Sequence, residues 1–159
     1  MMKVIFLDID GVLNEDITPT RTKSRVIFID QEKLLRLKRI VDATGAKIVL
    51  SSTWRYDRDD TRYNGDFLEL REAFYNAGLD FYDYTPEDAL GIRRGMEIRA
   101  WLGLHRGEVE RFIILDDELF DFEERGLLFH LIKTDFGDGG LTEELTQEAI
   151  EMLNGNEKI

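Results

Sequence analysis

Short apolar segments that alternate with amphipathic helical segments are the feature that most limits the folds open to this chain. Apolar runs at residues 3–8, 47–50 and 111–115 predict buried strands, and weaker runs at 79–84 and 130–134 predict two more. Helical spacing predicts four helices, which are expected between Asp30 and Gly45, over 66–77, over 94–102, and from Thr142 to Leu153. Such alternation is typical of an α/β fold with a mostly parallel sheet and helices on both faces.

The residues expected to face the core follow from the same spacing. The first helix is expected to bury a set of aliphatic residues, namely Leu34, Leu35, Leu37, Ile40 and Val41. The second is expected to bury Leu68, Leu70, Phe74 and Ala77. Residues 25–29 are expected to form a short strand or the return arm of a hairpin.

Polar residues follow three of the predicted strands. Asp8 ends the first strand, Ser51 follows the second and Asp116 follows the fourth. Ligands of open α/β sheets bind beyond the carboxyl ends of the strands. The three polar residues are therefore expected to meet at one edge of the sheet.

The chemistry of these strand ends favours a hard cation and a phosphate. Asp8 and Asp10 are two residues apart, and their mutual repulsion is relieved by a cation, with Asp116 as a third oxygen ligand. Magnesium prefers such sites. A cation next to carboxylates suits phosphoryl transfer, and a carboxylate can itself attack phosphorus to give an aspartyl-phosphate. An Asp-x-Asp pair on its own also occurs by chance in turns.

The amino-acid composition limits which binding partners and which cellular compartment are expected. The formal net charge of −12 argues against stable binding of extended nucleic acid, although residues 21–39 carry seven bases against two acids. The absence of cysteine excludes disulfides and thiolate chemistry. No apolar run approaches 18 residues and residues 1–7 do not resemble a secretory leader, so we expect no membrane partner and a cytoplasmic location.

Four segments resemble, in order, the motifs of the haloacid dehalogenase (HAD) superfamily. They are VIFLDIDGVLN at 4–14, KIVLSS at 47–52, RGMEI at 94–98 and FIILDD at 112–117. The resemblance implies a HAD-like Rossmannoid three-layer sandwich with a five-stranded sheet in the order 5-4-1-2-3. More narrowly, DIDGVLN, LSSTWR at 50–55, RGMEIRAWL at 94–102 and TDFGDGGLT at 134–142 are similar to the HAD domains linked to Swiss Army Knife RNA-repair proteins.

The resemblance also implies roles at the matching positions. Asp8 would be the nucleophile and a metal ligand, and Asp10 the general acid and then the general base, with its backbone carbonyl on Mg²⁺. Ser51 would bind a phosphoryl oxygen, and Asp116 would complete the metal ligands with Asp117 beside it. The second acid of the first motif is typical of HAD phosphatases rather than dehalogenases.

The basic residue of the third motif has two candidates, Arg93 and Arg94. Arg94 is preferred because Gly95 follows it, and as the first residue of a helix it is expected to bring backbone N–H groups to the phosphate.

Residues 52–55 leave several alternatives open. Trp54 is expected either to pack or to stack on a nucleobase, with packing favoured. Arg55 is expected either to bind a second phosphate or to form an ordinary salt bridge. Ser52, like Asp117, is a candidate for supporting the site or contacting the substrate.

HAD enzymes often carry a cap domain at one of two insertion points. Residues 14–30 suffice only for a hairpin flap, and 56–93 are taken up by one helix, one strand and connections. We therefore expect a capless single domain over 1–159, with an open site that admits a large substrate.

Two functions compete at this stage, and a third, weaker option is phosphotransfer to an acceptor other than water. The leading hypothesis is a magnesium-dependent phosphohydrolase that acts on a phosphomonoester, such as a nucleotide or a polynucleotide end. The alternative is a non-catalytic HAD-like binding subunit of a nucleic-acid repair complex.

Overall fold

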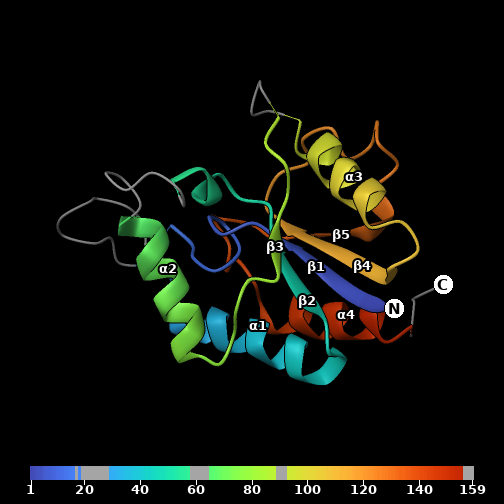
Figure 1. The fold of residues 1–159 in the computed structure, drawn as a ribbon. Coiled ribbons are helices and arrows are strands. Elements are labelled where there is room, and N and C mark those ends of the chain that lie inside the picture. The colour runs from blue at the N-terminus through green and yellow to red at the C-terminus, as the bar shows by residue number, and fades with distance from the viewer. Residues whose placement is uncertain (17, 19–28, 58–64, 89–92, 156–159) are drawn as a thin grey trace.

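Five parallel strands form the centre of the molecule in the computed structural model, which describes residues 1–16, 18, 29–57, 65–88 and 93–155 (Figure 1). The strands are β1 (Met2–Leu7), β2 (Lys47–Leu50), β3 (Asp83–Tyr84), β4 (Val109–Asp116) and β5 (Leu131–Lys133). Their order is β3-β2-β1-β4-β5, and each neighbouring pair is parallel. This is the predicted order read from the opposite edge, so the HAD-like Rossmannoid topology is confirmed.

Helices cover both faces of the sheet. The helices α1 (Gln31–Thr44), α2 (Gly65–Asn76) and α4 (Glu143–Leu153) lie on one side, and α3 (Arg94–Leu104) lies on the other (Figure 1). Two 3₁₀ turns, η1 (Thr53–Asp57) and η2 (Leu128–His130), complete the elements. Within the described residues, no helix combines the length and the hydropathy that crossing a bilayer requires.

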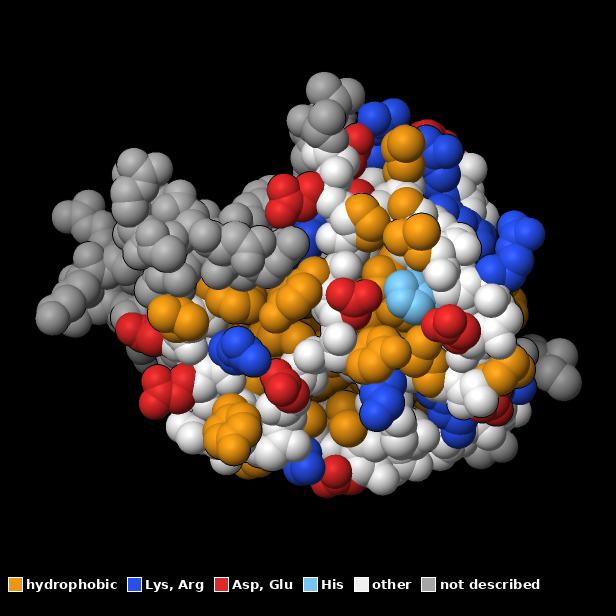
Figure 2. All heavy atoms as spheres, in the orientation of Figure 1, with side chains coloured by type: hydrophobic (Ala, Val, Ile, Leu, Met, Phe, Trp, Pro, Cys, Tyr) orange, Lys and Arg blue, Asp and Glu red, His pale blue; other side chains and the backbone are white. Residues whose placement is uncertain are grey.

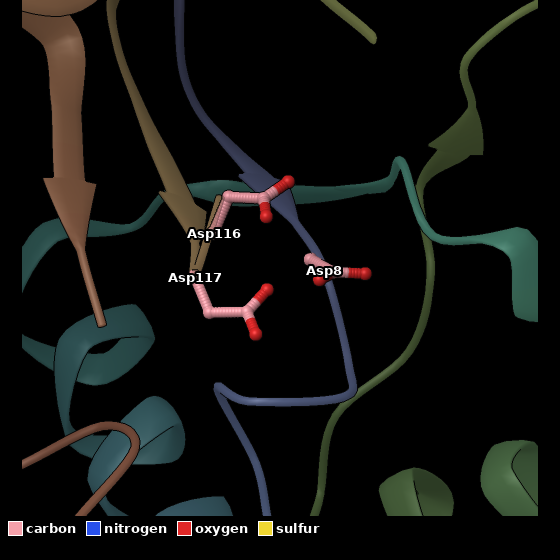
Figure 3. Close-up of side chains that lie close together, drawn as sticks. All are labelled: Asp8, Asp116 and Asp117. Carbon is pink, nitrogen blue, oxygen red and sulfur yellow. The ribbon is translucent and has the colours of Figure 1, made fainter. Parts of the chain in front are cut away.

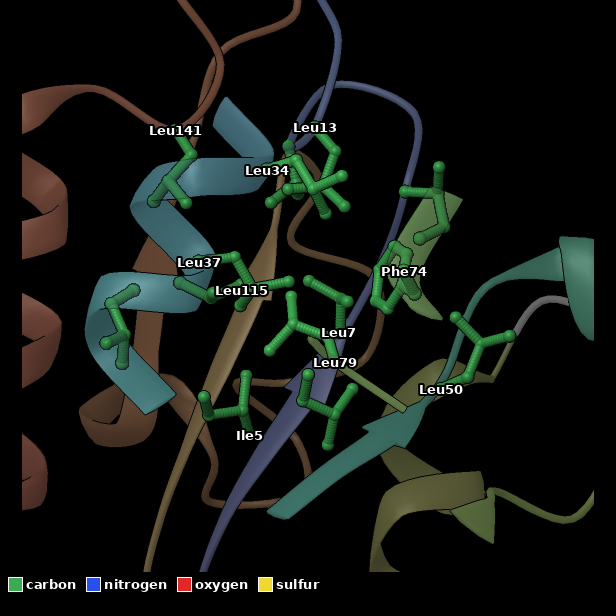
Figure 4. Close-up of a cluster of buried hydrophobic side chains, with 14 of the residues drawn as sticks. Ile5, Leu7, Leu13, Leu34, Leu37, Leu50, Phe74, Leu79, Leu115 and Leu141 are labelled. Atoms are coloured by element: carbon green, nitrogen blue, oxygen red, sulfur yellow. The ribbon is translucent and has the colours of Figure 1, made fainter. Parts of the chain in front are cut away.

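The alternation of side chains along β1 divides the core into two clusters. Ile5 and Leu7 face α1, α2 and α4, whereas Val4 and Phe6 face α3. Figure 4 shows the first cluster, in which leucines of α1 pack against β1 and β4. Burial on both faces explains why the central strands are almost continuously apolar.

The predicted helix ends are confirmed for α1 and α4. The side chain of Asp30 accepts hydrogen bonds from the N–H groups of Glu32 and Lys33, and Gly45 ends α1 in the left-handed conformation with φ 72°. Thr142 caps α4 by accepting from the Leu145 N–H.

Two residues predicted to be buried are exposed instead. Leu35 is 60% exposed and Leu68 is 50% exposed. Leu35 lies on the opposite side of α1 from the buried stripe formed by Leu34 and Leu37. In α2 the buried stripe has i, i+3, i+7 spacing and begins at Phe67, so Leu68 falls outside it. Both predictions were wrong because they assigned the core face by residue type rather than by the angular position of each residue around the helix axis.

The third strand is shorter than predicted. Asp83 and Tyr84 form the strand beside β2, whereas at Leu79 the chain is still leaving α2, and the Leu79 N–H donates to the Phe74 carbonyl. Residues 25–28 of the predicted strand at 25–29, and most of the flap at 14–30, lie outside the described residues. The single-domain, capless organisation stays a prediction.

Candidate active site

Three carboxylates converge at the carboxyl edge of the sheet. Asp8 directly follows β1, Asp116 ends β4 and Asp117 follows it. One carboxylate oxygen from each lies within 4.8 Å of the others (Figure 3). Asp8 and Asp116 are buried, and Asp117 is partly buried. The sequence pattern predicted that the ends of β1 and β4 would meet, and the structure also brings the side chain of Asp117 into the cluster.

The electrostatics of this cluster favour a bound cation. Burial raises the pKa of Asp8 from its ordinary value of 3.8 to about 7; Asp117 and Asp10 add to the rise, and the Arg94 guanidinium opposes it. Burial, followed by the Asp8 charge, also raises the pKa of Asp116 well above its usual range. Asp116 Oδ2 is buried and accepts no hydrogen bond from the described residues. A divalent cation with a preference for oxygen, such as Mg²⁺, would satisfy all three groups.

Arg94 is the cation already present in the cluster. Its Nη1 lies 3.6 Å from Asp8 Oδ1 and 3.5 Å from Asp116 Oδ2, and the residue is buried. These separations are too long for hydrogen bonds, and Nη1 donates none to the described residues. Arg93 instead forms two hydrogen bonds with Asp88, at 3.0 and 2.8 Å. Arg94 is therefore the arginine that reaches the carboxylates.

Ser51 contributes a second unpaired donor at the same edge. Its N–H donates to the Leu7 carbonyl at 2.9 Å, which places it beside Asp8. Its hydroxyl is buried and has no hydrogen-bond partner in the described part of the chain. A hydroxyl and a guanidinium N–H, both buried and unpaired, are suited to anionic oxygens.

The backbone N–H groups expected to help at the start of α3 are already occupied. Gly95 N–H donates to Asp121 Oδ1 at 2.6 Å, and Met96 N–H donates to Asp121 Oδ2 at 3.2 Å. The expectation that they bind phosphate is wrong, because Asp121 caps α3 in place of a side chain from Arg93.

Arg55 is enclosed within the fold. It is fully buried, pairs with Glu97, and donates to the carbonyls of Thr85 and Ser52. The structure shows the ion pair that was one of the two predictions for Arg55, and the contact with a second phosphate stays a prediction. Ser52 is also buried, and its hydroxyl accepts the Trp54 N–H at 3.2 Å, so it shapes the η1 turn.

Glu97 was not singled out from the sequence. It lies one turn after Arg94 on α3, and its Oε1 is 3.6 Å from Arg94 Nε. Its other oxygen pairs with Arg55 and accepts the Asp88 N–H. Burial raises the pKa of Glu97. The i, i+3 spacing from Arg94 could have identified Glu97 as a charged neighbour of the arginine.

Phe120 also supports Arg94. The guanidinium carbon lies 4.8 Å from the centre of the Phe120 ring, within the range of a cation–π contact. Phe120 has a φ of 41°, an unusual conformation for a bulky residue. Nothing in the sequence pattern pointed to this contact.

The side chain of Asp10 lies outside the group of three carboxylates. It is exposed, and it accepts hydrogen bonds from Asn14 Nδ2 and Trp54 Nε1, each at 3.0 Å. Trp54 packs partly against the core, as favoured from the sequence, and also uses its N–H toward Asp10. The structure therefore separates the two acids of the first motif: Asp8 faces the cluster and Asp10 faces the η1 turn.

The loop after β1 requires glycine at position 11. Gly11 has a φ of 84°, and a Cβ there would lie 2.2 Å from Asp117 Oδ2. Thr134 Oγ1 donates to the Gly11 carbonyl at 2.6 Å, and the Leu141 N–H donates to the Val12 carbonyl. The segment 134–142 thus supports the loop that follows β1.

Basic side chains gather away from the carboxylates. Figure 2 shows basic side chains over α3. A surface hollow at the end of that helix is lined by Arg99, Arg106 and Arg111 together with apolar side chains such as Leu102 and Phe129. The hollow adjoins the start of β4 rather than its carboxyl end, so it lies away from the carboxylate cluster.

The comparison with protein families agrees with this geometry. Residues 4–145 match the family described as the HAD domain in Swiss Army Knife RNA repair proteins. The chain belongs to this family. The matched region of this HAD domain includes Asp8, Ser51, Arg94 and Asp116. None of the curated proteins compared with the chain matches it.

Family membership supports a HAD-type phosphohydrolase or a related function, and HAD proteins generally use Mg²⁺. The description of the family associates this HAD domain with RNA repair.

Proposed function

We propose that this HAD domain is a magnesium-dependent phosphohydrolase that removes phosphate from a phosphomonoester through an aspartyl-phosphate on Asp8. The arrangement of buried carboxylates beside the unpaired Arg94 Nη1 and Ser51 hydroxyl carries the proposal. This arrangement offers a nucleophile, oxygen ligands for a cation and donors for phosphoryl oxygens within one cluster.

The proposed roles follow from the position of each group. Asp8 and Asp116 would hold Mg²⁺ together with the Asp10 carbonyl, and Asp117 lies close enough to support them. When bound, Mg²⁺ would neutralise negative charge on the phosphoryl group and on these carboxylates. Arg94 and Ser51 would donate hydrogen bonds to the other phosphoryl oxygens.

The reaction divides into two steps. In the first, an Asp8 oxygen attacks phosphorus, the bond from phosphorus to the ester oxygen breaks, and Asp10 donates a proton to the departing alkoxide. In the second, water attacks the aspartyl-phosphate while Asp10 takes its proton, which releases phosphate and restores Asp8.

A nucleotide or polynucleotide end is the substrate class that we favour. The description of the family supports it, as does the basic stretch of residues 21–39. The net charge of −12 argues for contact with an end rather than with a long tract.

A non-catalytic binding subunit is the second candidate. The metal site of such a subunit would need Asp8 and Asp116, but it would not need the carboxylate side chain of Asp10. The presence of both Asp8 and Asp10 favours the enzyme.

The decisive experiment is a phosphatase screen with and without Mg²⁺ that includes 3′- and 5′-phosphorylated oligonucleotides and small phosphomonoesters. We expect Mg²⁺-dependent phosphate release by the wild type and by Asp16→Asn, a matched control at an exposed acid of the same loop. Activity on small esters only would contradict the nucleic-acid substrate. No release from any ester, by a protein that binds Mg²⁺, would favour the binding subunit.

A further inference from the structure

Both oxygens of the Asp10 carboxylate are held by side chains that the proposed reaction does not otherwise use. Asn14 Nδ2 donates to Oδ1 and Trp54 Nε1 donates to Oδ2, each at 3.0 Å. Asp10 itself is exposed, and an exposed carboxylate without such partners would sample several rotamers.

The two donors are themselves anchored. Asn14 is buried, and its Oδ1 accepts the Gly11 N–H at 2.8 Å, which fixes the orientation of its amide. Trp54 lies in η1 and packs against the main core cluster. The indole N–H can only donate, so it is a fixed donor aimed at the carboxylate.

The contact joins the loops after two neighbouring strands. Asp10 follows β1, and Trp54 follows β2, 44 residues further along the chain. A role in packing alone would not require the indole nitrogen to face the carboxylate, because a phenylalanine ring could fill a similar space.

We propose that Trp54 and Asn14 are positioning residues that hold the Asp10 carboxyl group for proton transfer to the leaving oxygen. The inference rests on the proposed function, since it presupposes that Asp10 acts as a general acid. It assigns the Trp54 N–H to the reaction rather than to base recognition.

The test compares two small esters that differ in their need for a proton. Para-nitrophenyl phosphate has a stable leaving anion, whereas an alkyl phosphate such as glycerol phosphate requires protonation of its leaving oxygen. The quantity compared is kcat/KM, because it reports the steps up to formation of the aspartyl-phosphate and excludes the later hydrolysis.

For Trp54→Phe, we expect kcat/KM to fall about 10- to 100-fold on the alkyl ester and less than about threefold on the aryl ester. The matched control is Trp101→Phe, which removes an indole–carboxylate hydrogen bond of 2.8 Å to Asp83, away from the carboxylate cluster. We expect this control to change both esters equally. Thermal melting of each variant establishes that it is folded.

A second variant keeps the test independent of Trp54. Asn14→Asp retains an oxygen for the Gly11 N–H but removes the donor to Asp10. It should show the same selective loss on the alkyl ester. In an Asp10→Asn background, Trp54→Phe should cause no further loss.

Equal losses on both esters, or no loss on either, would overturn the positioning role while leaving the phosphohydrolase intact. A wild type that turns over neither these esters nor phosphorylated oligonucleotides would overturn the proposed function together with this inference.

Discussion

At the scale of single residues, the carboxylate cluster opposes folding when no cation is bound. Asp8 and Asp116 are buried beside each other, and the Arg94 guanidinium lies too far from both for a hydrogen bond. Residues placed for chemistry in this way are expected to cost stability. Substitutions in the cluster should therefore lower the activity while raising the stability of the metal-free protein.

Asp8→Asn should abolish turnover and stabilise the metal-free protein. The amide is a poor nucleophile, so we expect kcat/KM to fall about a thousandfold or more. The same change removes a buried charge that raises the pKa of Asp116, so the melting temperature without metal should rise. Full activity in folded Asp8→Asn protein would contradict the nucleophile assignment.

Glu97→Gln should destabilise the fold strongly. The change leaves Arg55 buried beside a neutral partner, and breaking a buried ion pair costs about 3–5 kcal/mol. Denaturant unfolding measures this loss, and Asp42→Asn, at the exposed pair with Lys38, is the control with a much smaller effect. Equal free energies of unfolding for Glu97→Gln and the wild type would refute a stabilising role for the buried Arg55–Glu97 ion pair.

At the scale of elements, the site depends on how closely loops from different strands approach one another. The loop after β1 contacts the segment 134–142, and it is joined to α1 by buried Lys33, which pairs with Glu15 and Asp30 at 3.1 Å each. The placement of Asp8 therefore depends on segments that lie far apart in the sequence.

Gly11→Ala should weaken Mg²⁺ binding as well as stability. Alanine at a positive φ costs about 1–2 kcal/mol, and at Gly11 its Cβ would also displace the Asp117 carboxylate. Gly45→Ala is the matched control, because Gly45 has a φ of 72° and a Cβ added there would meet no described atom within 4 Å. Both variants should lose stability, but only Gly11→Ala should bind Mg²⁺ more weakly by calorimetric titration. Equal Mg²⁺ affinity in the two variants would count against a part for Asp117 in the site.

At the scale of the whole molecule, the charge cluster links metal binding, proton binding and folding. Mg²⁺ would bind only the folded protein, so it should raise the melting temperature by mass action. Protons compete with the cation for the same carboxylates.

Stabilisation by Mg²⁺ should increase with pH. The Asp8 pKa is raised from 3.8 to about 7, so in that interval the folded protein holds a proton that the unfolded chain has released. The free energy of unfolding of the metal-free protein therefore falls as pH rises through this window, and the loss is complete above about pH 7. Because Mg²⁺ must displace that proton, millimolar Mg²⁺ should raise the melting temperature more at about pH 8 than at about pH 6.

Asp116→Ala is the control for this measurement and should remove most of the shift at either pH. A shift that is independent of pH, or one that survives in Asp116→Ala, would contradict binding at this cluster.

The sequence by itself determined the fold class and the edge at which Asp8, Ser51 and Asp116 meet, and its resemblance to the HAD superfamily implied the strand order. The fold class and this edge depend on local periodicity and on a general rule of parallel sheets, so neighbouring residues suffice to predict them. The ends of α1 were predictable for the same reason, because Asp30 and Gly45 act on the backbone next to them.

Only the tertiary structure decided which side chains contact the carboxylates at the sheet edge and which are engaged elsewhere. Arg55 and Arg94 are chemically alike, yet one is enclosed with Glu97 and the other reaches Asp8. Trp54 meets Asp10 across 44 residues, and Asp121 takes the N–H groups at the start of α3. These contacts depend on side-chain direction and on close approach between loops that are remote in the sequence, and no local pattern encodes either.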